Sequence, residues 1–184
     1  MKIVLGMTGA TGALYAKLFI DYIQKREDID LSVVSTMNGL RIFSDEIGSD
    51  LREYGVSYFD DNDFDVPFVS GSAPYHGMVV MPCSMGMLGR VAHGVSHDVI
   101  SRTADVMLKE KRKLILVPRE TPLSSIHLKN MLTLSDAGAT ILPAMPAFYS
   151  KPQSMEDLAT TVVSRVLDQF NIHHDLTDRW HVEK

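Results

Sequence analysis

The sequence predicts one doubly wound α/β domain built on a mainly parallel sheet. Short apolar runs of strand length alternate with amphipathic stretches of helix length, which is the pattern of βαβ units. The first apolar run leads into a glycine-rich turn and then a helix. The 184 residues, 45% of them hydrophobic, suffice for one substantial core but hardly for two. We expect a single domain over residues 1–184, with a C-terminal tail over about 171–184.

The N-terminal part of the chain predicts two strands and two helices. Residues 3–5 are apolar and stop at glycine, and residues 13–26 carry apolar side chains three to four apart, as a buried helix face requires. A second apolar run at 31–35 precedes a helical segment that passes through residues 42–51. Residues 58–72 contain four aspartates with proline and glycine nearby, so we expect a solvated surface loop there.

The C-terminal part repeats the alternation three more times. Gly138 stands where a helix C-cap is expected, and Ser154 precedes the last helix, where its side chain could cap the amide of Glu156 or Asp157. The expected strands are residues 77–82, 114–117 and 139–142, and the expected helices begin after Cys83 and cover 98–113, 125–137 and 154–170.

Composition excludes several classes of partner and site. The formal charge of −5 gives no basic surface for nucleic acid or anionic membrane. No apolar run approaches the roughly 20 residues that span a bilayer, and the N-terminal run is too short for a signal peptide. The single cysteine, Cys83, allows neither an internal disulfide nor a cysteine-cluster metal site. We therefore expect a cytoplasmic protein without nucleic-acid or membrane partners.

The glycine-rich turn is the first candidate ligand site. Residues 6–12 read GMTGATG, and glycines at such a turn let the backbone approach an anion closely. The turn lacks the G-x-G of a dinucleotide site, and the second strand ends at Ser35 where an acid would bind a ribose. Hydroxyl side chains stand at the strand ends instead, at Thr8, Thr11 and Ser84 as well. This set suits the single phosphate and polar chain of a mononucleotide.

A second candidate group is cationic. Arg102, Lys109, Arg119 and Arg165 come from different elements, and each alone is most simply explained as a surface charge. Arg119 is the exception, because it follows a central strand, where open parallel sheets bind ligands. Glu120 comes directly after it and could exchange a proton with a substrate phosphate.

The histidines and Cys83 give weaker signals. No pair of histidines has the spacing of a metal site such as H-E-x-x-H, so we expect no bound metal. No base partner for Cys83 is evident, and we interpret it as a small packed residue.

Several strings closely resemble the UbiX-type flavin prenyltransferases, also described as phenylacrylate decarboxylase family proteins. They keep the order and spacing of that family over nearly the whole chain, to Arg179-Trp180. The strings are GMTGATGA at 6–13, PCSM at 82–85, RTADVMLKE at 102–110, LVPRETPL at 116–123, HLKNML at 127–132, PAFY at 146–149 and KPQS at 151–154.

The resemblance implies a flavodoxin-like, Rossmann-like subunit that assembles into a homododecamer and binds FMN across subunit interfaces. It implies dimethylallyl phosphate as prenyl donor, no metal, and a prenylated FMN that serves a UbiD-type decarboxylase. In such a reaction N5 of reduced FMN bonds to C1 of the dimethylallyl group and C6 bonds to its C3.

The resemblance also implies roles for individual residues. Arg102 would be a site or interface residue, and Glu120, Thr11 and a second carboxylate, Asp45 or Glu46, would serve the chemistry; Asp45 is our choice. The family usually has serine at the position of Thr11, whose rotamers are more restricted. FMN would be held by Gly9, Ala10, Thr11, Ser35, Ser84, Met85, Gly86, Met87 and Arg119. The donor phosphate would be bound by Tyr149, Arg165, Lys109 and Arg119.

Two other functions fit the same features. One is an FMN-dependent cysteine-type decarboxylase of the same fold, which would use a catalytic histidine and would give the Arg119-Glu120 block no role. The other is a non-catalytic FMN-binding subunit, which would not need the residues for a donor phosphate.

Overall fold

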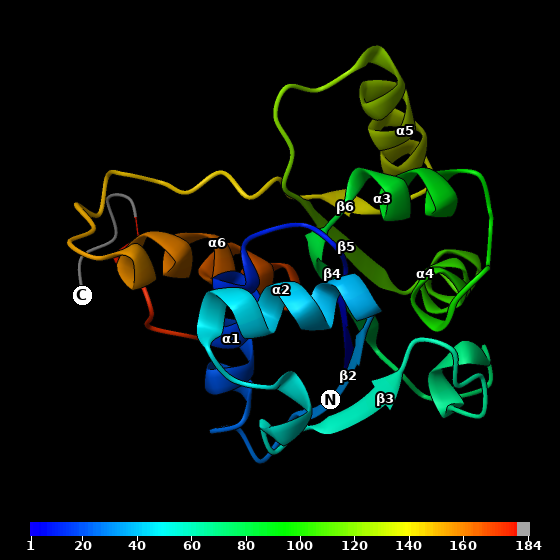
Figure 1. Ribbon diagram of the computed structural model, residues 1–184, viewed down its shortest axis with the longest axis horizontal. Helices are drawn as coiled ribbons and strands as arrows, with labels where there is room; N and C mark the ends of the chain where they lie inside the picture. The colour runs from blue at the N-terminus through cyan, green and yellow to red at the C-terminus, as the bar shows by residue number, and fades with distance from the viewer. Residues whose placement is uncertain (180–184) are drawn as a thin grey trace.

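The computed structural model describes residues 1–179, in which six parallel strands form one sheet (Figure 1). The strands lie in the order β3-β2-β1-β4-β5-β6, so the direction of winding reverses between β1 and β4. Residues 180–184, with Trp180 and the end of the expected tail, lie outside the described part. The strands are β1 (Lys2–Met7), β2 (Asp30–Ser35), β3 (Ser57–Asp60), β4 (Gly77–Cys83), β5 (Lys113–Pro118) and β6 (Thr140–Ile141).

Helices cover both faces of the sheet, with α1 and α6 on one side and α4 on the other (Figure 1). The prediction of a single doubly wound parallel sheet is thus confirmed, in its Rossmann-like strand order. No helix within residues 1–179 is long and apolar enough to cross a membrane. The helices are α1 (Ala13–Ile23), α2 (Met37–Ile47), α3 (Met85–Ala92), α4 (Val99–Lys109), α5 (Ser125–Asp136) and α6 (Met155–Gln169), with 3₁₀ turns η1 (Leu51–Glu53) and η2 (Pro67–Val69).

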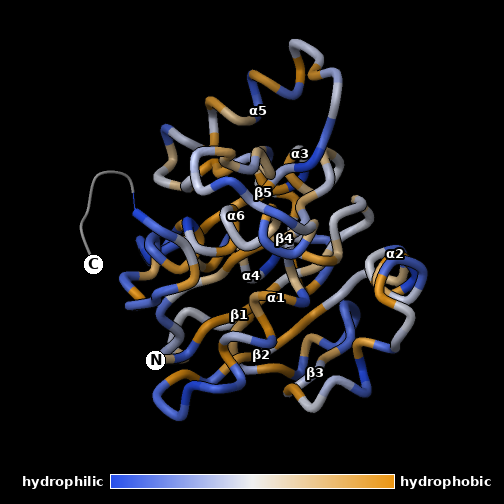
Figure 2. The backbone as a smooth tube through the Cα atoms, turned by 90° about the vertical axis from the view of Figure 1, so that its left-hand side faces the viewer, coloured by the Kyte–Doolittle hydropathy of each residue, from blue (hydrophilic) through white to orange (hydrophobic). Residues whose placement is uncertain are grey.

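The central strands are buried on both faces, which explains their continuous apolar runs (Figure 2). In β1, Ile3 and Leu5 pack against α1 and α6, whereas Val4 faces the core under α3 and α4. One strand therefore supplies two hydrophobic cores, and its path between two helical layers fixes where its C-terminal end emerges.

The loop predicted at 58–72 is wrong at its start. β3 pairs there with β2, from Ser32 opposite Ser57 to Ser35 opposite Asp60. Tyr58 and Phe59 are half-buried, so this edge strand lacks the apolar run by which the other strands were recognised.

Helix ends follow the expected capping chemistry. The Ser154 side chain accepts a hydrogen bond from the amide of Asp157 at 3.0 Å, and Gly138 adopts a φ of +101° directly after the C-cap of α5. The helix expected to pass through residue 51 ends earlier, because Gly48 takes a φ of +77° at the C-cap of α2.

Candidate active site

The C-terminal ends of four neighbouring strands meet at one edge of the sheet. Met7 lies beside Ser35, and Cys83 lies beside Pro118, in the parallel register of β1 with β2 and of β4 with β5. Most of the predicted FMN-binding residues follow these ends. We use "strand-tip site" for residues 8–12, 35–36, 84–87 and 119–120.

Thr8 joins the two central loops of the strand-tip site. Its buried hydroxyl donates to the carbonyl oxygen of Pro82 at 3.0 Å and accepts a hydrogen bond from the amide of Ser84 at 2.7 Å. The loops after β1 and β4 are therefore fixed relative to each other before any ligand binds.

The glycine loop leaves Gly9 and Thr11 exposed while Ala10 is buried. A Cβ on Gly9 would lie 3.0 Å from the Cβ of Asn38, so glycine is what lets this loop approach the first turn of α2. Gly12 has a φ of +107° and forms the N-cap of α1 without a side-chain cap.

Two side chains from other elements hold this loop. The carboxylate of Glu46 accepts hydrogen bonds from the amide of Gly12 at 3.0 and 3.1 Å and from that of Ala13 at 2.7 Å. From the end of β5, Arg119 Nε donates to the carbonyl oxygen of Thr11 at 3.3 Å. A carboxylate thus occupies the N-terminus of α1, where a dinucleotide fold would bind pyrophosphate.

The hydroxyl of Ser35 is buried at the end of β2. It donates to the carbonyl oxygen of Thr36 at 3.1 Å, which leaves its oxygen lone pairs as acceptors. Gly39 makes room for it, since a Cβ there would lie 2.5 Å from the Ser35 hydroxyl oxygen.

The second helix N-terminus of the site belongs to α3. The Ser84 hydroxyl accepts a hydrogen bond from the amide of Met87 at 3.3 Å, and Gly86 is exposed with open space around its Cα. The side chains of Met85 and Met87 point into the core, at 8% and 0% exposure. Of these four predicted FMN ligands, Gly86 thus presents an open backbone, whereas the two methionines can offer only main-chain groups.

Arg119 and Glu120 directly follow β5 and line a cavity of about 290 Å³. The amide of Arg119 donates to the carbonyl oxygen of Cys83 at 3.3 Å, which ties the residue to the end of β4. Glu120 is exposed, and its carboxylate accepts a hydrogen bond from the amide of Thr121 at 3.0 Å. A cation and a carboxylate therefore stand together at the mouth of the site.

Cys83 is fully buried at the end of β4. Burial raises the pKa of its thiol to about 12, so it is protonated at neutral pH and is a poor nucleophile. The structure agrees with its interpretation as a packed residue.

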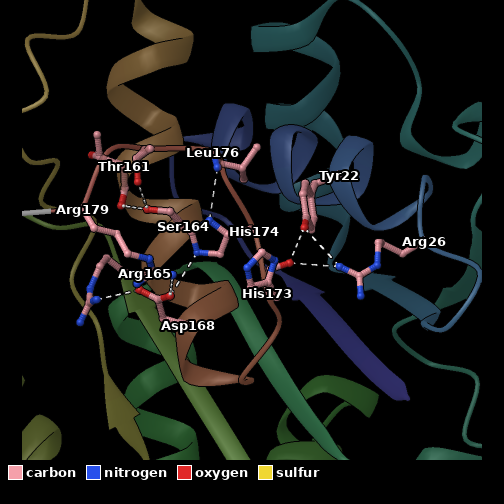
Figure 3. Close-up of polar contacts among 11 residues, drawn as sticks. Tyr22, Arg26, Thr161, Ser164, Arg165, Asp168, His173, His174, Leu176 and Arg179 are labelled. Carbon is pink, nitrogen blue, oxygen red and sulfur yellow. Dashed lines mark hydrogen bonds and ion pairs between the residues drawn. The ribbon is translucent and has the colours of Figure 1, made fainter. Parts of the chain in front are cut away.

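Of the residues predicted to bind the donor, Arg165 lies on α6 (Figure 3) and Tyr149 precedes that helix in the chain. Asp168 accepts hydrogen bonds from Arg165 at 2.7 Å and from Arg179 at 2.8 Å, and lies 3.1 Å from His174. Burial raises the pKa of Asp168, but the bond from Arg179 and the charges of Arg179 and His174 outweigh it and lower the pKa. The hydrogen bond to Asp168 and the charge of Asp168 raise the pKa of Arg179, with smaller contributions from Asp175 and Tyr149.

Arg102 and Lys109 lie on α4, on the opposite face of the sheet from α6. Arg102 pairs with Asp105 at 3.0 Å, and Lys109 pairs with Glu110 at the C-terminal end of the helix. Within one chain the predicted donor-binding cations thus form three separate groups: on α4, on α6 and at the strand tips.

The two candidates for the second carboxylate differ in their surroundings. Asp45 is exposed and lies 3.7 Å from Arg41 on its own helix. Glu46 contacts the glycine loop and lines, with Thr11, a cavity of about 520 Å³ between α1, α2 and α6.

Three features were not expected from the sequence. Glu46 contacts the loop amides, Asp168 contacts two arginines, and His174 is buried. The first two depend on which side of a helix faces a neighbouring segment, whereas His174 lies in the segment that follows α6. A signal was present only for Glu46, in the adjacent Asp45-Glu46 pair.

The strand-tip site fits a mononucleotide. At the N-terminus of α3, Ser84 caps the amide of Met87 and Gly86 is exposed, and Arg119 supplies a positive charge beside the exposed Thr11. Residues 1–179 contain no group of three or more histidine, cysteine, aspartate or glutamate side chains placed to hold a metal ion.

Comparisons with known proteins agree with this interpretation of the geometry. The flavoprotein family matches residues 1–167. The flavin prenyltransferase UbiX of Halalkalibacterium halodurans is 45% identical, over 98% of this chain and 93% of the relative. The AnUbiX (PadA1) structure in complex with FMN and dimethylallyl pyrophosphate is 41% identical, with a TM-score of 0.94 over 100% of this chain and 98% of that one. A dodecameric FMN-dependent UbiX-like decarboxylase from Escherichia coli O157:H7 is 39% identical, with a TM-score of 0.95 over 99% and 100% of the two chains. This chain belongs to the UbiX family of flavin prenyltransferases.

Proposed function

We propose that this protein joins a dimethylallyl group from dimethylallyl phosphate to N5 and C6 of reduced FMN. The observation that carries the proposal is the strand-tip site, where the first turn of α3 with its exposed Gly86, the exposed Gly9 and Arg119 stand together. These groups suit the phosphate and ribityl chain of FMN, and Glu120 stands beside them for proton transfer.

FMN binding is assigned to the strand tips. Donors come from the glycine loop and the first turn of α3, with Gly86 leaving the backbone accessible. Arg119 reaches the same region from β5. The full proposed set is Gly9, Ala10, Thr11, Ser35, Ser84, Met85, Gly86, Met87 and Arg119.

Donor binding is assigned to cations from more than one copy of the chain. Arg165 and Tyr149 lie on the α6 side, whereas Lys109 and Arg102 lie on α4, on the other face. A homo-oligomer could bring the α6 group of one copy to the strand tips of another, as subunit assembly permits. The exposed Phe148 and Met145, 70% and 72% accessible, give the segment before α6 an apolar surface for such an interface.

The proposed reaction needs charge neutralisation and one proton relay. A bond forms between N5 and C1 of the dimethylallyl group while the bond from C1 to the phosphate oxygen breaks, and basic side chains stabilise the leaving phosphate. A second bond joins C6 to C3, with C2 gaining a proton and C6 losing one. Glu120 could carry this proton, alone or through the released phosphate, with Thr11 and Asp45 as further candidates.

We further propose that residues 1–184 act as one domain in the cytoplasm, without a metal, and that the prenylated FMN passes to a UbiD-type decarboxylase. The direct test incubates the protein anaerobically with reduced FMN and each donor, the monophosphate and the diphosphate, and weighs the flavin. A gain of one five-carbon prenyl unit supports the proposal. An unchanged flavin with both donors would contradict it.

A further inference from the structure

The contact between Glu46 and the glycine loop replaces a missing N-cap. A helix leaves its first amides without partners inside the helix, and α2, α3 and α4 satisfy one of theirs with Thr36, Ser84 and Asp98. The N-cap of α1 is Gly12, which has no side chain to do this. Glu46 supplies the acceptor from another helix, with both carboxylate oxygens engaged.

The glycine loop is held at three points. Thr8 fixes its start to β4, Arg119 holds the carbonyl oxygen of Thr11, and Glu46 holds the amides that follow. Arg119 is also assigned to FMN, so it has to serve both the loop and the ligand. Glu46 bonds to amides of the α1 N-terminus and is not among the proposed FMN ligands.

The bond is also electrostatically favourable. A carboxylate at a helix N-terminus interacts with the positive end of the helix dipole, and charge-assisted hydrogen bonds are stronger than neutral ones. Because Glu46 fills this position, a ligand phosphate has to bind elsewhere in the site.

We infer that Glu46 is a positioning residue, which holds residues 9–12 in the conformation that receives FMN. The inference deepens the proposed function and rests on its assignment of the glycine loop to FMN. It assigns Glu46 no contact with the reacting atoms.

The test compares three variants with the wild-type protein. Glu46→Ala removes both acceptors, Glu46→Gln keeps one neutral acceptor, and Glu156→Gln is the control. Glu156 lines the same cavity, from the first turn of α6, and its substitution removes the same charge. Hydrogen–deuterium exchange of peptides covering residues 8–16 reports loop order, flavin fluorescence quenching reports the Kd for FMN, and the Tm reports global stability.

We expect faster exchange at residues 9–14 and an FMN Kd raised about tenfold in Glu46→Ala, the effect of losing one cap interaction. Glu46→Gln should be intermediate, and Glu156→Gln should match the wild type. If Glu46→Ala does not fold, Glu46→Gln decides alone. The inference would be overturned if Glu46→Gln, together with Glu46→Ala where that variant folds, kept the wild-type rate of amide exchange at residues 9–14. It would equally be overturned if these variants kept the wild-type Kd for FMN. Both measurements use FMN without donor, so a wild-type protein that binds FMN but forms no prenylated flavin would refute the proposed function alone.

Discussion

Arg119 Nε donates a hydrogen bond to the carbonyl oxygen of Thr11 at 3.3 Å and so connects the end of β5 to the glycine loop. The contact crosses β4, which lies between β1 and β5 in the sheet. One guanidinium therefore links the two sides of the strand-tip site.

Replacing this guanidinium should weaken FMN binding. We expect Arg119→Ala to raise the FMN Kd by about ten- to a hundredfold, because a charge-assisted contact and a loop contact are lost together. Arg119→Lys should recover little, since a lysine cannot bridge two groups in a fixed fork. Flavin fluorescence titration measures the Kd, and Arg52→Ala, an exposed arginine paired with Asp50, is the control. Wild-type affinity in Arg119→Ala would remove Arg119 from the site.

Substitutions of Arg165 and Tyr149, which are proposed to bind the donor phosphate, should affect donor binding without affecting FMN binding. Arg165→Ala and Tyr149→Phe should each raise the donor KM about tenfold or more while the FMN Kd stays unchanged, because both residues lie on the α6 side of the chain. Steady-state prenylation at varied donor concentration measures the KM. A normal KM in Arg165→Ala would show that this arginine does not bind the donor phosphate.

If each active site combines residues from two copies of the chain, two inactive variants should complement each other in a mixed oligomer. Oligomers that combine Arg165→Ala chains with Glu120→Gln chains should recover part of the activity that each pure variant lacks, because some sites then receive both native residues. The measurement is prenylated flavin formed after the two variants are mixed and reassembled. No recovery in verified mixed oligomers would place both residues of a site in one chain.

The main elements of the fold could be predicted because their side chains are buried and therefore apolar. The prediction failed where an element is only partly buried. Continuous apolar runs identify the central strands in the sequence, whereas Tyr58 and Phe59 of β3 are only half-buried at the sheet edge. The strand-tip residues were found because open parallel sheets bind ligands there. No physical ground in the sequence favoured Asp45 over Glu46, since adjacent helical residues point about 100° apart and only packing fixes the rotation of α2. The spacing of residues along the sequence likewise did not show that Lys109 and Arg165 lie on opposite faces of the sheet.

Asp61 should make stability fall as pH rises from about 4 to 6. Burial, and then the charge of Asp98, raise its pKa to about 6 from 3.8, against the opposing effects of Arg90 and His97. One of its carboxylate oxygens is buried without a hydrogen-bond partner in residues 1–179. The folded state holds the proton more tightly than the unfolded chain, so the ionised form is penalised above pH 6.

Asp61→Asn should therefore stabilise the protein at pH 8, by about 1–2 kcal/mol after allowance for solvent screening of a half-exposed group. The gain should vanish below about pH 3, where the carboxyl is protonated in both states. Thermal unfolding at the two pH values measures the difference. An equal effect of Asp61→Asn at both would show that this carboxyl is not perturbed.

The thiol of Cys83 should be unreactive in the native protein. Because its thiol is buried and its pKa is about 12, we expect no alkylation by iodoacetamide in the native protein and full alkylation after denaturation. Cys83→Ala should retain turnover within about twofold, since only a small packed group is lost. Intact-mass analysis and a prenylation assay check the two expectations, and loss of turnover in a folded Cys83→Ala protein would assign the thiol a chemical role.

The central claim is that a dimethylallyl group leaves its phosphate and enters FMN at this site. A single-turnover reaction with reduced FMN and dimethylallyl phosphate, sampled for both inorganic phosphate and flavin mass, tests it most directly. We expect phosphate and prenylated flavin to appear in equal amounts and at the same rate. Phosphate released while the flavin keeps its mass, or no phosphate released at all, would contradict the assignment.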